Sequence, residues 1–319
     1  MSRSPERSGY FLRGQDNLGR KRACWGGDAE TLASTAKADK ALQTSAIAEA
    51  TKNRNTWLFA MSSVLKFKLT LAFDGSAYQG WQSQRSGKGV QDQVEKALAR
   101  LFPSTPRIQG SSRTDAGVHA LGMVAHFEVP GEDFRMPARH LVLAINACLP
   151  DDIRILKAVR ARADFHARFD ATGKEYRYRI WNGAAMNPLL RTQAWHVPRP
   201  LDLPAMQTAA LFFVGRHDFR SFTANRGGEL LDAVRTLTRC EIRRRGPELT
   251  VIIEGGGFLY KMCRGITGTL VQIGEGRFPP EEVKTMLARH DRRVAGMNAP
   301  AHGLVLQKVH YRQASANTP

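Results

Sequence analysis

The chain has 319 residues and carries 47 lysines and arginines against 29 aspartates and glutamates, a formal net charge of +18. This length allows one large or two modest domains, each with a hydrophobic core. No stretch approaches the roughly 18 consecutive apolar residues that span a bilayer, which argues against a membrane role. The charge indicates an anionic partner, most often a nucleic acid, although a generic basic surface stays open and composition does not separate RNA from DNA.

Residues 1–60 differ from the rest of the chain. They are rich in Ser, Ala, Thr, Arg and Lys and show little sustained periodicity. Scattered acidic residues argue against a transit peptide, and no signal-peptide core is present. We expect this segment to be a disordered extension or a misassigned start, since Met61 directly precedes the first convincing strand.

The pattern becomes regular after Met61. Apolar residues alternate with lysines and small residues in the first predicted strand, and Val90, Val94 and Leu98 fall at helical spacing. The predicted elements are a strand over 65–73, a helix over 90–101, a strand through Ile108, a strand over 123–129, a helix over 137–148 and a strand over 153–159.

The following residues repeat that order of elements without a close sequence repeat. Gly215 closes the first helix, and Gly246-Pro247 joins two strands as a hairpin. The predicted elements are a strand over 176–181, a helix over 203–214, a hairpin of 234–244 with 248–254, a helix carrying Phe258 to Ile273 on one face, a helix over 281–290 and a strand over 304–311.

Two successive βαββαβ units predict an α+β fold built from two ferredoxin-like halves. We place the halves at 61–166 and 167–315, with a short tail at 316–319. Each half would carry helices on one face of an antiparallel sheet and leave the other face free to line a groove.

The cysteines indicate a reducing compartment and buried side chains. Cys24, Cys148, Cys240 and Cys263 are widely spaced and form no CxxC pair, so we predict no zinc site. His119 and His126 stand seven residues apart in a partly extended segment, and we assign them no metal.

A single carboxylate at the centre of a basic segment is the first candidate for chemistry. Asp115 falls between the second and third predicted strands, in a loop of small residues with Gly117, which permits a positive φ. A carboxylate repels phosphates, so its presence on a phosphate-binding surface points to catalysis. From spacing alone, however, an aspartate that caps its own turn is the better interpretation.

A family resemblance changes that balance. The segment 113–120, Arg-Thr-Asp-Ala-Gly-Val-His-Ala, closely resembles the catalytic signature of the tRNA pseudouridine synthase A family. The resemblance covers about residues 64–312. Further segments resemble the family in the same order, namely 73–82, 146–150, 164–169, 175–178, 218–222, 258–268 and 299–304.

The resemblance implies a cofactor-free isomerase that converts uridine to pseudouridine at positions 38, 39 and 40 of the tRNA anticodon stem-loop. It also implies two ferredoxin-like halves that form a central antiparallel sheet, with an RNA-binding cleft between them. The protein would be a cytoplasmic homodimer that binds each tRNA with both subunits.

The resemblance also assigns roles to four residues. Asp115 matches the essential aspartate that attacks or deprotonates the sugar, and the pattern leaves these two roles open. Arg264 matches its ion-pair partner, although a phosphate contact is the alternative. Tyr176 matches the tyrosine that stacks on the flipped uracil, and a core aromatic is its alternative. Arg113 would occupy the space left by the base or contact a phosphate.

Two positions depart from the family pattern. Ser112 stands where members usually carry glycine, and Cys263 replaces a more usual valine. Neither change removes a catalytic group, and the effect of Ser112 on the local turn stays open.

A stripe of arginines has two possible roles. Arg235, Arg239 and Arg243 recur at even spacing, which puts them on one face of a regular strand. The stripe would follow an RNA backbone or form a solvated outer face, and the two interpretations are equal.

Two other function classes stay as alternatives. The first is a non-catalytic RNA-binding or RNA-folding protein on the same scaffold. The second, a metal-dependent nuclease, is disfavoured because no compact carboxylate cluster accompanies Asp115.

Overall fold

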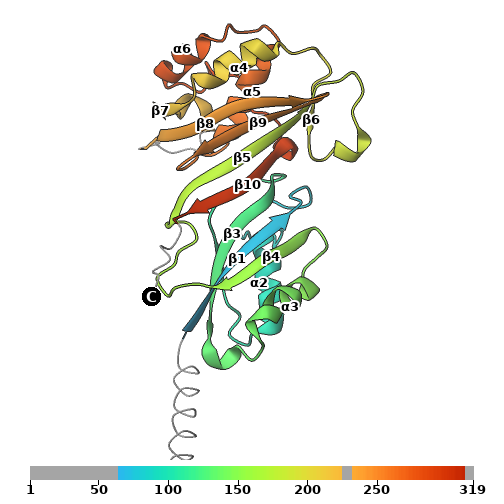
Figure 1. Ribbon diagram of the computed structural model, residues 1–319, viewed down its shortest axis with the longest axis vertical. Coiled ribbons are helices and arrows are strands. Elements are labelled where there is room, and N and C mark those ends of the chain that lie inside the picture. The colour runs from blue at the N-terminus through green and yellow to red at the C-terminus, as the bar shows by residue number, and fades with distance from the viewer. Residues whose placement is uncertain (1–63, 225–231, 313–319) are drawn as a thin grey trace, which may run out of the picture. The chain divides into compact units, whose positions relative to one another are not determined.

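The computed structural model describes residues 64–224 and 232–312. The expected extension at 1–60 and the tail at 316–319 lie outside the described residues. Within the described ranges all strands join one sheet (Figure 1). These strands are β1 (Val64–Phe73), β2 (Ile108–Gly110), β3 (His119–Pro130), β4 (Ile153–Arg160), β5 (Ala171–Trp181), β6 (Trp195–His196), β7 (Gly215–Asp218), β8 (Val234–Arg245), β9 (Glu248–Gly255) and β10 (Leu304–Tyr311).

Five α-helices accompany the sheet in the described ranges, and α2 packs against α3 while α4 packs against α5. They are α2 (Val90–Leu101), α3 (Leu141–Cys148), α4 (Leu203–Leu211), α5 (Met262–Gly274) and α6 (Glu282–Arg289). None of these helices is long and apolar enough to cross a membrane. A large, mostly antiparallel sheet with separate helices confirms the predicted α+β class.

The sheet has the order β4-β1-β3-β10-β5-β9-β8-β7, with β2 beside β3 and β6 beside β5. Neighbours along this path are antiparallel except at one place. There, β3 and β10 pair in parallel, with Val305 opposite His119 and Leu306 opposite Ala120. The last strand of the described chain therefore lies in the middle of the sheet and joins the two groups of strands (Figure 1).

Alternation along β1 explains how the first core forms. Phe67, Leu69, Leu71 and Phe73 are buried, and the residues between them are more exposed, as the sequence predicts. Helix α2 buries four residues at helical spacing, Val90, Val94, Ala97 and Leu98. Each of the valine, leucine and phenylalanine side chains among them stabilises the fold by about 1.5–3 kcal/mol when fully buried.

The helices predicted over 203–214 and 137–148 are longer than the observed ones. The helix expected over 203–214 ends at Leu211, because the chain turns and Gly215, with φ of 114°, begins β7. Phe213 still satisfies the apolar pattern, since its ring packs 5.0 Å from that of Phe222 in the core. The helix expected over 137–148 begins as the 3₁₀ turn Ala138–His140, and only Leu141–Cys148 is α-helical.

The prediction that Arg235, Arg239 and Arg243 share one face of a strand is wrong. The pairing of β8 with β9 shifts by one residue between Leu237 and Arg239. A bulge of this kind exchanges the two faces of a strand. Consistent with that exchange, Leu237 is buried before the bulge and Cys240 and Ile242 are buried after it. Arg235 therefore lies on the face opposite to Arg239 and Arg243, and the latter two both bind Glu241.

The backbone of helix α5 packs directly against the backbone of the segment before β10. A Cβ placed on Gly268 would lie 1.8 Å from the carbonyl oxygen of Met297, which is a severe steric clash. Next to this contact, the Ala299 N–H donates to the Arg264 carbonyl at 3.0 Å. The glycine therefore lets the segment at 297–301 lie directly on the helix that carries Arg264.

We expect Gly268→Ala to destabilise the fold by about 1–3 kcal/mol, since the added methyl group forces the helix and the segment apart. Urea denaturation followed by circular dichroism measures this loss. Gly256→Ala is the matched control, because the nearest atom to its added Cβ is 3.9 Å away. Equal unfolding midpoints for the two variants would contradict the close packing.

Candidate active site

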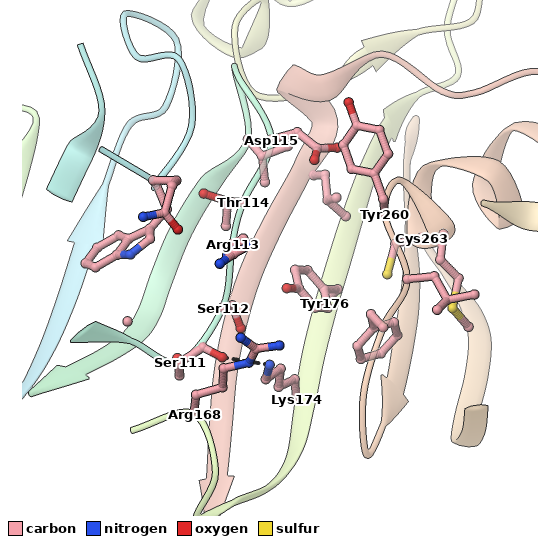
Figure 2. A pocket seen from close by; sticks show the side chains of 18 of the residues that line it. Ser111, Ser112, Arg113, Thr114, Asp115, Arg168, Lys174, Tyr176, Tyr260 and Cys263 are labelled. Atoms are coloured by element: carbon pink, nitrogen blue, oxygen red, sulfur yellow. Dashed lines mark hydrogen bonds between the residues drawn. The ribbon is translucent and has the colours of Figure 1, made fainter. Parts of the chain in front are cut away.

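A cavity of about 460 Å³ opens between the β2–β3 loop and the segment before α5. Figure 2 shows the 111–115 segment on one side, Lys174 and Tyr176 of β5 in the middle, and Tyr260 and Cys263 on the other side. Among the described residues that line it, Asp115 is the single carboxylate. The lining lysines and arginines are Arg113, Arg168, Lys174 and Lys261.

The cavity does not lie on a helix-free face. Tyr176 contributes to it together with Met262 and Cys263, the first residues of α5, so it occupies the face on which that helix packs. The sequence predicted that the face without helices would line the groove. The cavity instead lies on the face of β5 that packs against helices, between the β2–β3 loop and helix α5.

Backbone contacts fix the loop that carries Asp115. The Val118 N–H donates to the Asp115 carbonyl at 3.1 Å, and Gly117 adopts the positive φ of 77° that the sequence suggested. Gly80, with φ of 90°, lies so close that a Cβ on it would be 2.4 Å from the Thr114 carbonyl oxygen. The Trp81 N–H donates to the same oxygen at 3.2 Å. The loop is therefore held from both sides of the carboxylate.

Asp115 and Arg264 form an ion pair although 149 positions separate them in the chain. Arg264 Nη1 donates to Asp115 Oδ2 at 3.2 Å, and Arg264 Nε donates to the Ala299 carbonyl at 2.7 Å. Only 14% and 15% of the arginine and aspartate side chains are exposed. Two hydrogen bonds in different directions orient the guanidinium, so the carboxylate meets it in one geometry.

Tyr176 forms part of the cavity wall. Its ring meets that of Phe258 edge-on, with centroids 4.9 Å apart, and only 7% of the residue is exposed. Burial raises the pKa of Tyr176, and the charge of Asp115 acts in the same direction, so the phenol stays protonated at neutral pH. Its hydroxyl points toward the Ser112–Arg113 segment (Figure 2).

The neighbouring residues Ser112 and Arg113 have different surroundings. The Ser112 hydroxyl is buried near Tyr176, but it makes no hydrogen bond within the described part of the chain. Arg113 is exposed, lines the cavity and makes no ion pair with any described residue. Its guanidinium is thus available to an anion that enters the cavity.

The sequence did not single out Lys174, Arg168 or Phe258 as site residues. Lys174 Nζ donates to the Ser111 carbonyl at 2.8 Å (Figure 2). Burial, with a smaller contribution from Arg168, lowers the pKa of Lys174 to about 8. Its even spacing from Tyr176 on one strand was the available signal. Phe258 was expected on the late helix, but α5 begins only at Met262.

One cluster of metal-ligand side chains occurs among the described residues. Glu175, Glu254 and His310 present ligand atoms within 4.8 Å of one another. Arg177 already donates to Glu175 at 2.7 Å, and His310 Nε2 lies 3.5 Å from Glu254 Oε1. Since Glu175 precedes Tyr176 on β5, the cluster faces away from Asp115.

Comparison with known proteins decides the family. A family model described as tRNA pseudouridine synthase matches residues 70–170 and 209–312. The chain belongs to the tRNA pseudouridine synthase family. Proteins named tRNA pseudouridine synthase A from Bacillus pumilus and Bacillus licheniformis are 41% and 42% identical to it over 249 residues, covering 77% of this chain and 99% of each relative. One of that name from Pelobacter propionicus is 44% identical over 244 residues, covering 76% of this chain and 98% of the relative.

The ranges matched by the tRNA pseudouridine synthase model include Arg113, Asp115 and Arg264. Tyr176 and Lys174 lie between the two matched ranges. For these two residues, the support from this chain is their position in the cavity beside the ion pair.

We expect the Lys174 ammonium to titrate with a midpoint near pH 8, which ¹³C NMR of the lysine side chain measures. The unfolded chain still holds this proton up to about 10.5, so the Lys174 contribution to stability rises between pH 8 and 10.5. Lys174→Met should remove that rise in urea denaturation, while Lys88→Met, a change at an exposed lysine, keeps it. A Lys174 midpoint near 10.5 would contradict the burial.

Proposed function

We propose that this member of the tRNA pseudouridine synthase family is an isomerase that converts uridine to pseudouridine in tRNA, with Asp115 as the catalytic carboxylate. The observation that carries the proposal is the pairing of Asp115 with Arg264 at the wall of a basic cavity. A polyanion is attracted to the lysines and arginines of this cavity, and one oriented carboxylate is presented to it.

The reaction conserves all atoms of the uridine. The bond between C1′ and N1 breaks, the uracil rotates, and a bond between C1′ and C5 forms. The proton on C5 leaves, and N1 ends with a hydrogen. Asp115 attacks C1′ or removes a proton from the sugar, and both roles require the ionised carboxylate that Arg264 stabilises.

Tyr176 and Arg113 take roles on either side of the reacting sugar. The wall position of the Tyr176 ring supports stacking on the extruded uracil, which recovers part of the few kcal/mol that base extrusion costs. The phenol is protonated and is suited to hydrogen-bond donation near C5. Arg113, exposed at the cavity, would occupy the space of the extruded base or hold a phosphate.

We also propose the finer features that the resemblance implies. The substrate positions are 38, 39 and 40 of the anticodon stem-loop, and the enzyme acts in the cytoplasm as a homodimer. The two halves are ferredoxin-like and divide near residue 166, with the RNA cleft between them. The matching orders β4-β1-β3-β2 and β10-β5-β9-β8 support this division.

Asp115→Asn should lower the release of tritium from [5-³H]uridine in tRNA by at least about 10³-fold while tRNA binding stays nearly intact, because the amide neither attacks nor accepts a proton. Asp164→Asn is the control, since this exposed carboxylate pairs only with Arg162 among the described residues. Substantial turnover by Asp115→Asn would overturn its role. Binding without turnover by the wild type would instead identify a non-catalytic RNA-binding protein.

Arg264→Lys should lower kcat by about a hundredfold with little change in KM, because an ammonium cannot reach Asp115 and Ala299 together and the carboxylate loses its orientation. The same tritium assay under saturating tRNA measures this effect. Arg277→Lys, at an exposed arginine that pairs with Glu275, should behave as wild type. A kcat equal to wild type in Arg264→Lys would show that the pair does not position Asp115.

A further inference from the structure

Phe169 is the only exposed phenylalanine among the described residues, and 74% of it is accessible. It belongs to the connection between β4 and β5 and lines the cavity that contains Asp115. An apolar ring of this size stabilises a fold by about 1.5–3 kcal/mol when it is buried, a gain that is absent here. Its exposure at the cavity therefore leaves the ring accessible to a bound molecule.

The neighbouring residues hold the ring in place. The His166 ring packs on Phe169 with centroids 4.2 Å apart and planes 34° apart. The backbone N–H groups of Arg168 and Phe169 both donate to His166 Nδ1, at 3.1 and 3.3 Å. His166 Nε2 therefore carries the hydrogen, and it donates to Gln109 Oε1 at 2.8 Å. The ring is thus preorganised.

Cationic side chains line the same cavity as this ring, and the neighbouring Asp170 carboxylate accepts a hydrogen bond from the His166 backbone N–H at 3.0 Å. The Arg168 guanidinium carbon lies 5.7 Å from the Phe169 centroid, and Lys174 lies beside Arg168 at one end of the cavity (Figure 2). Asp115 lies at the other end of the residues labelled there. A flat aromatic surface beside one cation, in a cavity lined by others, fits a nucleotide whose base stacks while its phosphate meets the charges.

We propose that Phe169, supported by His166, is a stacking platform for an unpaired nucleobase next to the target uridine in the RNA strand. This inference rests on the proposed function, since it places the extruded uridine beside Asp115 and Tyr176 in the same cavity. The platform contacts a flanking base through its ring face and reads no base edge. It therefore tolerates different bases at that position and contributes affinity and placement.

Fluorescence of 2-aminopurine tests the platform without turnover. The probe replaces the nucleotide on the 5′ or the 3′ side of the target uridine in a tRNA transcript, and Asp115→Asn is the background. Binding should quench the probe at one of the two positions. Adding Phe169→Ala or Phe169→Leu should remove this quenching, and Phe169→Tyr should keep it. Equal quenching with alanine at position 169 would overturn the proposal.

Turnover measures the contribution of the stack. In the otherwise wild-type chain, Phe169→Ala and Phe169→Leu should lower kcat/KM for tRNA by about 5- to 150-fold, and Phe169→Tyr should stay within about threefold. Leu211→Ala, at an exposed leucine of α4 that does not line the cavity, should change nothing. Full activity with leucine at position 169 would overturn stacking. If the wild type forms no pseudouridine, the proposed function fails. The 2-aminopurine assay still shows whether Phe169 stacks on a base.

Discussion

The ion pair between Asp115 and Arg264 is the interaction on which the site depends. It joins a loop between the first strands to a helix near the end of the chain. Both side chains are mostly buried, and leaving either one without its partner would cost about 3–5 kcal/mol. The fold therefore has to bring these two elements together. It does so through the parallel pairing of β3 with β10, because β3 follows Asp115 directly and the segment before β10 receives the second hydrogen bond of Arg264.

Close backbone packing gives this ion pair its fixed geometry. Glycines let the segment at 75–80 contact the Asp115 loop and let the segment at 297–301 contact α5. His119 connects both regions, because Gly75 N–H donates to its Nδ1 and its Nε2 lies 3.0 Å from the carbonyl oxygens of Thr192 and His302. Nε2 therefore carries a hydrogen and donates to these oxygens. The signature segment thus supplies the carboxylate and, four residues later, the side chain that anchors its loop.

Local patterns predicted most of the fold, and long-range packing accounts for what they missed. Alternation over β1 and the Gly246-Pro247 turn gave correct elements because one buried face and one turn residue fix them. The short strands β6 and β7 have no such pattern, and the bulge in β8 depends on its pairing with β9. In the site, Asp115, Arg264 and Tyr176 came from a family resemblance. Spacing alone favoured a turn aspartate. For Lys174 the one local signal was its even spacing from Tyr176 on β5, and no spacing pattern marks Phe169 as a cavity residue.

The charge of the chain acquires a specific meaning at the cavity. Lysines and arginines line it around one carboxylate, an arrangement that attracts an RNA backbone and presents a single carboxylate to it. Mapping of pseudouridine at nucleotide resolution, in a pseudouridine-free tRNA pool treated with the purified chain, tests this account most directly. New pseudouridine confined to positions 38, 39 and 40 is the predicted result. Its absence, or its formation only outside the anticodon stem-loop, would contradict the account.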